Sequence, residues 1–235
     1  QLVALAEVRP GQRVLDVACG TGVVAREAAT RMRGEGTVVG LDLNPGMLEV
    51  ARRLGPDIEW RQGDAASLPF SADSFDVVLC QAALMFMPDP ARALREMARV
   101  VSRSGTVAVQ VWDRLEAQRA HAPLVEVAAR HAGPEAIQLL SSYWVLGDRT
   151  QLKSLFESAG LEVADIVTRV EMARFDSTDE LVRTEVESTP LVERISAEVY
   201  RSILEDSREA LKSFVLETGE VDIPLQAHIV VARPR

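Results

Sequence analysis

Three short features of the chain carry residues that can bind a nucleoside-containing cofactor. A glycine-bearing turn, Ala18 to Gly22, follows an apolar run and precedes a helical pattern. Glycine lets backbone approach a ligand closely, and the first turn of a helix offers unpaired N–H groups. Asp42 lies 22 residues after Gly20 (42 − 20), and Asp64 lies 22 residues after Asp42 (64 − 42). Each aspartate comes just past a short apolar or β-branched run. Together these residues predict a cofactor site along one edge of a parallel sheet.

The elements that must position these residues alternate in the first half of the chain. Apolar or β-branched runs predict strands at 13–17, 37–41, 58–62, 75–80 and 105–112, and helical patterns lie between them at 22–32, 45–54 and 90–101. This alternation predicts a doubly wound parallel sheet with ligands at the carboxyl ends of its strands. Asn44 and Pro45 are typical of a helix start, and Ser104-Gly105 is expected to end the third helix.

The pattern changes after Trp112. Helices are expected within 114–143, over 150–159 and 178–188, and in one longer run from Thr189-Pro190 to Gly219, with strands at 161–170 and 224–233. The expected organisation is a core over 1–112, a helical cap insertion over 113–147, a core helix and sixth strand over 148–174, a second cap insertion over 175–219, and a closing strand over 220–235. The two insertions are expected to cover the cofactor.

Composition narrows the function classes. The chain has 235 residues, a net charge of −9 and no cluster of basic residues, which argues against nucleic acid as a partner. Arg95, Arg99 and Arg103 recur every four residues, a spacing typical of a solvated helix stripe. Cys19 and Cys80 have no Cys or His nearby in sequence, which indicates buried thiols in a reducing cytoplasm. Neither a signal peptide nor a membrane-spanning run is evident, and because the chain begins with Gln1 we expect a native segment upstream.

Four ordered motifs resemble those of the class I S-adenosylmethionine-dependent methyltransferases. They read VLDVACGTG, GLDLNPGML, GDAASLPF and FDVVLCQAALMFMPDPARALREMARVVSRSGTVAVQVW, within residues 10–112. They are most similar to the small-molecule branch that includes the ubiquinone-biosynthesis type, and TPLVERI and QAHIVVARP resemble bacterial members more loosely. The resemblance implies a Rossmann-like α/β fold with a seven-stranded, mostly parallel sheet whose last strand is antiparallel. It also implies in-line methyl transfer from S-adenosylmethionine to a small metabolite, with S-adenosylhomocysteine as product.

The resemblance assigns the methionine end of the cofactor to the first motif. Backbone N–H groups and the helix dipole suit a carboxylate there, in a turn made of Ala18, Cys19, Gly20, Thr21 and Gly22. Asp16 either accepts a hydrogen bond from the cofactor's ammonium group or braces the loop backbone. Gln81, at the end of the fourth strand, is expected nearest the transferred methyl group.

The adenosine end is assigned to the second and third motifs. A carboxylate at Asp42 can accept from both ribose hydroxyls. By the resemblance, Asp64 contacts the adenine amino group and the Ala65 N–H meets a ring nitrogen. Leu43 and Met47 are expected to pack on the adenine or ribose, with ordinary core packing as the alternative for Met47.

Candidates for substrate binding and proton transfer are few. Met85 and Phe86 either line a substrate pocket or pack under the helix from residue 90, and Tyr143 and Trp144 can stack on a planar substrate. His121 and His131, in the first insertion, are the only candidates for a general base, although a lone histidine on a helix is more often structural or solvated. No cluster of His, Cys and acidic residues has metal-ligand spacing, so no metal is expected.

Two other functions share part of this pattern. A nicotinamide-dependent oxidoreductase would use the glycine turn and Asp42, but it leaves Asp64 unexplained, and the chain lacks a Tyr-x-x-x-Lys pair. A third alternative is a catalytically silent cofactor-binding subunit or a protein-interaction subunit. Asp42 and Asp64 argue against a decayed site, because a relative that no longer bound the cofactor would have no use for both acids. The residues leave open the acceptor, the choice among O-, N-, C- and S-methylation, and whether the protein is a monomer or a homodimer.

Overall fold

The computed structural model describes all residues from 1 to 235, which divide into two compact units. The first unit comprises Gln1–Val111, Arg149–Thr168 and His228–Arg235, and the second comprises Trp112–Asp148 and Arg169–Ala227. The expected insertions, 113–147 and 175–219, fall within the second unit. That they cover the cofactor stays a prediction.

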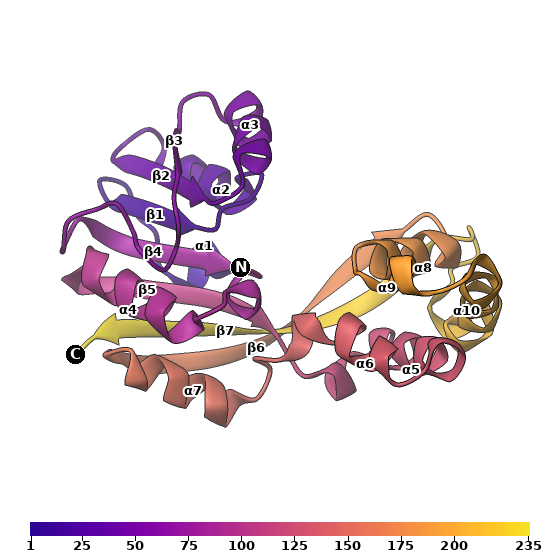
Figure 1. Cartoon of the computed structure of the whole chain (residues 1–235). Coiled ribbons are helices and arrows are strands. Elements are labelled where there is room, and N and C mark those ends of the chain that lie inside the picture. The colour runs from indigo at the N-terminus through magenta and orange to yellow at the C-terminus, as the bar shows by residue number, and fades with distance from the viewer. The chain divides into compact units, whose positions relative to one another are not determined.

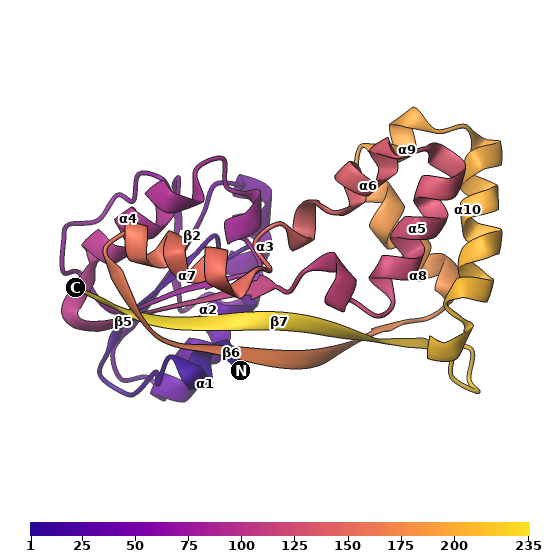
Figure 2. The same ribbon diagram turned by 90° about the horizontal axis from the view of Figure 1, so that it is seen from below.

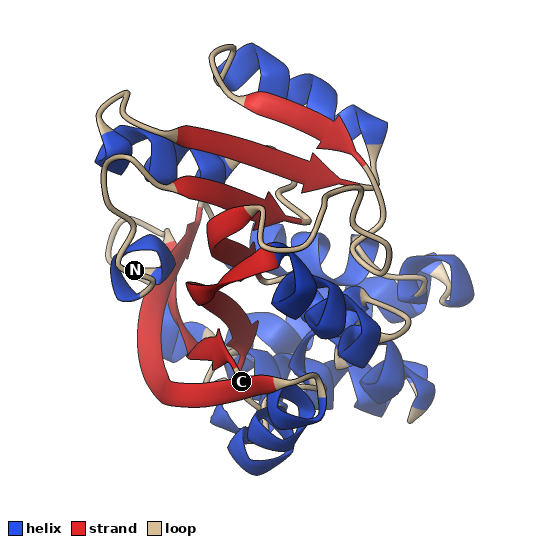
Figure 3. Ribbon diagram, turned by 90° about the vertical axis from the view of Figure 1, so that its left-hand side faces the viewer, coloured by secondary structure: helices blue, strands red, loops and turns tan.

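The strands form one mixed sheet of seven, in the order β3-β2-β1-β4-β5-β7-β6 (Figures 1 and 3). Their bounds are β1 (Arg13–Val17), β2 (Thr37–Asp42), β3 (Glu59–Gln62), β4 (Phe75–Gln81), β5 (Val101–Trp112), β6 (Leu161–Phe175) and β7 (Val221–Pro234). β1 pairs in parallel with both β2 and β4, and β7 is antiparallel. The α/β fold with a seven-stranded sheet is therefore confirmed. Because β1 pairs in parallel with β2 and β4, its carboxyl end lies beside the carboxyl ends of those two strands.

Helices cover both faces of the sheet in the first unit. They are α1 (Leu2–Leu5), α2 (Val23–Met32), α3 (Pro45–Leu54), α4 (Pro90–Val100) and α7 (Arg149–Ser158), with a short 3-10 turn, η1, at Leu84–Phe86. Figure 2 shows α4 and α7 on one face and α1 on the other. Buried side chains of α1, α2, β1 and β4 form one apolar core, in which Val14, Ala25 and Ala28 are fully buried. None of the helices in the chain combines the length and the apolar composition that a membrane span requires.

The predicted start of α3 is confirmed, but the expectation that Ser104-Gly105 ends the third helix is wrong. Asn44 Oδ1 accepts the N–H groups of Gly46 and Met47, and Pro45 is the first helical residue. α4 ends at Val100, and β5 begins at once with Val101 in an extended conformation. Ser104-Gly105 therefore lies inside a strand. A Cβ at Gly105 would stand 2.7 Å from the Asp76 carbonyl oxygen. The lack of a side chain at Gly105 therefore lets β5 approach β4 closely at the point where the register between these two strands shifts.

The second unit is helical around its own core. It contains α5 (His121–Ala132), α6 (Glu135–Leu140), α8 (Thr178–Glu187), α9 (Leu191–Arg194) and α10 (Ala197–Ala210), with 3-10 turns η2 (Leu115–Ala117), η3 (Ser142–Trp144) and η4 (Lys212–Phe214). Buried side chains of α5, α6, α8, α9 and α10 pack together, among them Leu124, Val182, Val186 and Ile203.

The single long helix expected from Thr189 to Gly219 is wrong. Ile195 is extended, and the Ser196 hydroxyl caps α10 by accepting the Val199 N–H at 3.2 Å. A serine that takes a backbone N–H in this way competes with continuation of the helix. Beyond Ala210 the chain makes a 3-10 turn and an antiparallel bridge between Val215 and Val221.

Candidate functional site

Two adjoining pockets lie at the carboxyl ends of β1, β2 and β4, both within the first unit. The first has a volume of about 410 Å³ and is lined by residues that include Leu43, Asp64, Ala65 and Phe86. The second, of about 290 Å³, includes Asp16, Thr21 and Gln81. Ala18 and Ala83 line both. The sheet therefore gathers residues from four separate motifs at one edge.

The turn between β1 and α2 has an unusual backbone. Ala18 has φ of 54°, Gly20 of 54° and Gly22 of 82°. The left-handed region suits glycine but costs an alanine about 1–2 kcal/mol. α2 begins at Val23, so its first N–H groups have no partner within the helix. A strained residue held beside free N–H groups at the edge of a pocket is typical of a binding site.

Asp16 is almost completely buried and lines the second pocket. Its Oδ2 accepts the Ala25 N–H at 3.0 Å, so the bracing contact expected as one alternative is present. Burial, with a smaller contribution from the nearby Asp42, raises the pKa of Asp16 to about 8. A cation placed beside this carboxyl would offset the cost of burying its charge.

Asp42 joins the end of β2 to the glycine turn. Its Oδ2 accepts the Gly20 N–H and its Oδ1 accepts the Asn44 N–H, both at 2.8 Å. Asp42 also lines the first pocket. Each carboxylate oxygen has a further lone pair, so these bonds leave acceptor capacity for a ligand.

Asp64 and Ala65 lie together in the loop after β3. Asp64 Oδ1 accepts the Ala66 N–H at 2.8 Å, and the Ala65 N–H makes no hydrogen bond to the chain. Both residues line the first pocket, as does Leu43, which is 66% exposed. Met47 lines neither pocket, and its 43% exposure makes the alternative of ordinary core packing wrong.

The two thiols differ in burial. Cys80 is fully buried in β4, whereas Cys19 is half-buried and lines the second pocket. Burial raises the pKa of both thiols above the ordinary range, which keeps them protonated at neutral pH.

The apolar residues after β4 differ in their relation to the pockets. Phe86, Met87 and Pro88 line the first pocket, and Met85 lines neither pocket.

The remaining predicted residues belong to the second unit. His121 is buried with Nε2 3.2 Å from Glu185 Oε1, and His131 Nε2 lies 2.9 Å from Asp206 Oδ2. The His121 ring centroid is 5.0 Å from that of Trp144, and Tyr143 Oη lies 3.4 Å from Ser188 Oγ. His121 Nδ1 and Trp144 Nε1 are buried without a hydrogen-bond partner.

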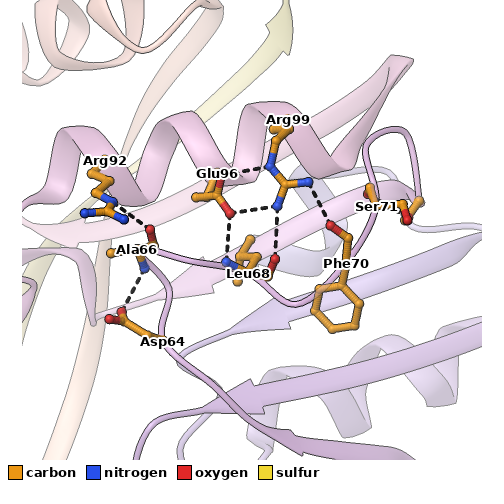
Figure 4. Close-up of polar contacts among 9 residues, drawn as sticks. Asp64, Ala66, Leu68, Phe70, Ser71, Arg92, Glu96 and Arg99 are labelled. Carbon is orange, nitrogen blue, oxygen red and sulfur yellow. Dashed lines mark hydrogen bonds and ion pairs between the residues drawn. The ribbon is translucent and has the colours of Figure 1, made fainter.

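Sequence reasoning missed the contribution of α4. Arg92 lines the first pocket and donates from Nε to the Ala66 carbonyl oxygen (Figure 4). The prediction of a solvated arginine stripe is wrong for two of its members. Arg99 bonds the carbonyl oxygens of Leu68 and Phe70, and Arg103 lies in β5 rather than in a helix. The spacing of Arg92, Glu96 and Arg99 by four and three residues was the available signal, since it places three side chains on one helix face.

Comparison with known proteins matches residues 15–109 to the family described as "Methyltransferase domain". Residues 15–109 are therefore similar to a methyltransferase domain. Among curated relatives, a demethylmenaquinone methyltransferase of Renibacterium salmoninarum is 45% identical over 100 residues, 43% of this chain and 41% of the relative. The Xanthomonas campestris ubiquinone/menaquinone biosynthesis C-methyltransferase UbiE is 40% identical over 121 residues, 49% of this chain and 48% of the relative.

A longer match is with an uncharacterized Mycobacterium tuberculosis protein, Rv1403c. The two are 34% identical over 193 residues, 76% of this chain and 64% of the relative. In each of these three comparisons the chain spans less than two thirds of the relative's length. Among solved structures, a putative methyltransferase of Bacillus halodurans has a TM-score of 0.68 at 22% identity, covering 100% of this chain and 97% of its own, which shows the fold.

Proposed function

We propose that this chain is an enzyme that transfers a methyl group from S-adenosylmethionine to a small-molecule acceptor. The observation that carries the proposal is the pair of adjoining pockets that share Ala18 and Ala83. A nucleoside with an amino-acid tail needs two such compartments, one for the base and ribose and one for the charged tail. The family match over residues 15–109 supports the same reaction class.

The residues present fit the adenosine half of the cofactor. Asp64 offers a carboxylate to the adenine amino group, and Ala65 offers an N–H that the chain itself leaves unbonded. Asp42 retains lone pairs for the ribose hydroxyls, and the exposed side chain of Leu43 gives an apolar surface for the base. Met47 is proposed at the rim of this surface.

The second pocket fits the methionine half. In the turn Ala18, Cys19, Gly20, Thr21 and Gly22, the N–H groups of Cys19, Gly20 and Gly22 bond the chain itself. A carboxylate is proposed to take the remaining N–H groups of this turn and of the start of α2, aided by the helix dipole. Asp16 places a carboxyl group where an ammonium group would be bound. Gln81 lies at the end of β4, where it can orient the reacting groups. S-adenosylmethionine, when bound, supplies a methyl group already activated by the sulfonium.

The protein's remaining task is to align the acceptor and exclude water. Phe86 and Met85 are proposed for the acceptor side within the first unit, and Tyr143 and Trp144 within the second. Where the acceptor is protonated at working pH, His121 or His131 is proposed as general base, since each imidazole has a carboxylate partner that orients it. Methylation of a small molecule rather than a nucleic acid is supported by the net charge of −9 and by the names of the quinone-pathway relatives.

Calorimetry with S-adenosylhomocysteine and with NAD tests the proposal. We expect the homocysteine compound to bind and NAD not to bind, because Asp64 and Ala65 match adenine in a pocket whose other half suits an amino acid. Binding of NAD without binding of S-adenosylhomocysteine would replace the proposal with the oxidoreductase alternative. A screen of candidate metabolites with methyl-labelled cofactor then identifies the acceptor.

A further inference from the structure

The loop that carries Asp64 and Ala65 has no regular secondary structure of its own. It runs between β3, which ends at Gln62, and β4, which begins at Phe75. Within the loop, the Ser67 N–H bonds the Asp64 carbonyl oxygen at 3.0 Å, which makes residues 64–67 one turn. The Gly63 N–H, which bonds the Asp42 carbonyl oxygen at 3.1 Å, holds the loop on one side of Asp64 and Ala65. On the other side their position depends on what holds residues 66–70.

Three side chains of α4 hold this segment by its backbone (Figure 4). Arg92 Nε donates to the Ala66 carbonyl oxygen at 2.8 Å, and Glu96 Oε2 accepts the Leu68 N–H at 2.8 Å. Arg99 donates to the Leu68 carbonyl oxygen at 3.0 Å and to the Phe70 carbonyl oxygen at 2.7 Å. Four backbone groups of the loop thus bond to one face of one helix.

Glu96 and Arg99 also hold each other. Arg99 Nε and Nη2 donate to Oε1 and Oε2 of Glu96 at 2.8 and 2.7 Å, a bidentate ion pair that fixes both side chains. The pair is partly buried, with side-chain exposures of 36% for Arg99 and 21% for Glu96. The hydrogen bonds from Arg99, followed by that from the Leu68 N–H, hold the pKa of Glu96 below its ordinary value, so Glu96 stays ionised at neutral pH.

We propose that Glu96 and Arg99 are positioning residues that set adenine selectivity by fixing the loop 64–70, although neither lines the cofactor pocket. The inference rests on the proposed function, because it assigns adenine to Asp64 and Ala65. Only one residue separates Ala66 from Asp64, so a shift of the backbone that α4 holds moves the Asp64 carboxylate and the Ala65 N–H together. Without the bonds from Glu96 and Arg99 the pocket remains, but the Asp64 carboxylate and the Ala65 N–H are no longer held in fixed positions.

Replacing adenine by hypoxanthine in the ligand tests whether Asp64 and Ala65 are held in these positions. Replacing the amino group of adenine by oxygen turns a donor into an acceptor and turns the ring nitrogen into a donor. Both groups then face the wrong partner at Asp64 and Ala65. The wild type is therefore expected to prefer S-adenosylhomocysteine over its inosine analogue by at least about a hundredfold, since buried polar groups left unpaired are costly.

The experiment measures affinity for both ligands by calorimetry in wild type, Arg99→Lys and Glu96→Gln. Lysine keeps the charge but loses the bidentate pair and at least one carbonyl bond, whereas glutamine keeps an acceptor for the Leu68 N–H. We expect the adenine-to-hypoxanthine preference to fall by about tenfold in Arg99→Lys and less in Glu96→Gln. Should Arg99→Lys not fold, Glu96→Gln with hydrogen exchange of residues 64–70 gives the same test.

Glu157→Gln is the matched control. Glu157 makes an exposed pair with Lys153 on α7, 3.8 Å apart, so the same substitution removes an intrahelical ion pair that has no bond to the loop. It is expected to leave the preference unchanged. If Arg99→Lys and Glu96→Gln leave the adenine-to-hypoxanthine preference unaltered, or reduce affinity for both ligands equally, the inference is overturned. Failure of the wild type to bind S-adenosylhomocysteine would instead overturn the proposed function, and this inference with it.

Discussion

At the residue scale, two aspartates combine a structural contact with a place in the site. Asp16 takes the Ala25 N–H and Asp42 takes the Gly20 N–H, so both carboxylates brace the segment between β1 and α2. Each also lines a pocket. A carboxylate already held by backbone N–H groups presents its free lone pairs in a fixed direction, which lowers the cost of ordering it for a ligand.

Substitution of Asp42 is expected to weaken cofactor binding. Asp42→Ala removes the proposed ribose acceptor and the bond to Gly20, and should raise the Kd for S-adenosylhomocysteine by at least about tenfold, as expected for loss of hydrogen bonds to a charged group. Asp42→Asn retains one acceptor for the Gly20 N–H and separates the two effects. Calorimetry gives the affinities, and Asp57→Asn, at an exposed position of the same unit, is the control. Unchanged affinity in Asp42→Ala would refute the ribose role.

Asp16 should make the stability of the free protein fall as pH rises. Burial raises the pKa of Asp16 from 3.8 to about 8, so the folded state binds its proton more tightly than the unfolded chain does. The resulting stability is fully present below the unfolded pKa and is lost as pH rises through the folded pKa. Urea unfolding between pH 5 and 8 should show a decline that Asp16→Asn removes.

Asp76 offers a control of opposite sign for that experiment. Its hydrogen bond from Arg13 lowers its pKa, so its contribution is present at neutral pH and is lost on acidification below the unfolded value. Asp76→Asn should therefore alter stability in the acid range and leave the decline between pH 5 and 8 in place. A decline that persists in Asp16→Asn would assign it to other groups.

At the scale of elements, the glycine turn depends on the neighbouring strand. Trp60 of β3 lies against Gly40 of β2 and Gly22 at the start of α2, and its Nε1 donates to the Gly55 carbonyl oxygen at 2.8 Å. A Cβ at Gly22 would stand 2.3 Å from the indole, whereas a Cβ at Gly20 would meet nothing within 4 Å. The two glycines of one turn are therefore required for different reasons.

The pair of variants Gly22→Ala and Gly20→Ala tests this difference. Both introduce alanine at a positive φ, which costs about 1–2 kcal/mol, but only Gly22→Ala also forces the indole to move, for about 1–3 kcal/mol more. Thermal or urea unfolding should show the larger loss in Gly22→Ala. Equal losses would mean that the indole moves aside without cost.

At the scale of the whole molecule, each unit has a core of its own. The core of α5, α6, α8, α9 and α10 involves only residues of the second unit, and both pockets are lined only by residues of the first. Stability of the helical unit and affinity for the cofactor should therefore be separable.

Ile203→Ala tests that separation. Ile203 is fully buried in the second unit, so truncation should destabilise that unit by about 2–5 kcal/mol. Hydrogen exchange in α5 and α8 should rise, while the Kd for S-adenosylhomocysteine stays at the wild-type value. Met97→Ala, in the buried face of α4, is the contrasting variant and should lower both stability and affinity. A loss of affinity in Ile203→Ala would contradict a cofactor site confined to the first unit.

The sequence by itself determined the order of elements and the residues at the strand ends. β1 and α3 were predicted with their observed bounds, because apolar runs, Asn44 and Pro45 act through local backbone preference. The same local signals failed where a longer contact decided. Gly105 was expected as a helix end but serves a strand contact, and the helix expected past Ile195 gave way to the cap at Ser196.

Only the tertiary structure decided what each functional side chain holds. Asp42 bonds a backbone N–H 22 residues away, and Glu96 bonds one 28 residues away. These bonds join groups that the sheet order and the packing of α4 bring together. Periodicity along the chain indicates which residues share a face of one element, but it does not predict contacts between distant segments. Arg99 therefore had the spacing of a solvated stripe in the sequence, and in the fold it holds the loop that lines the first pocket.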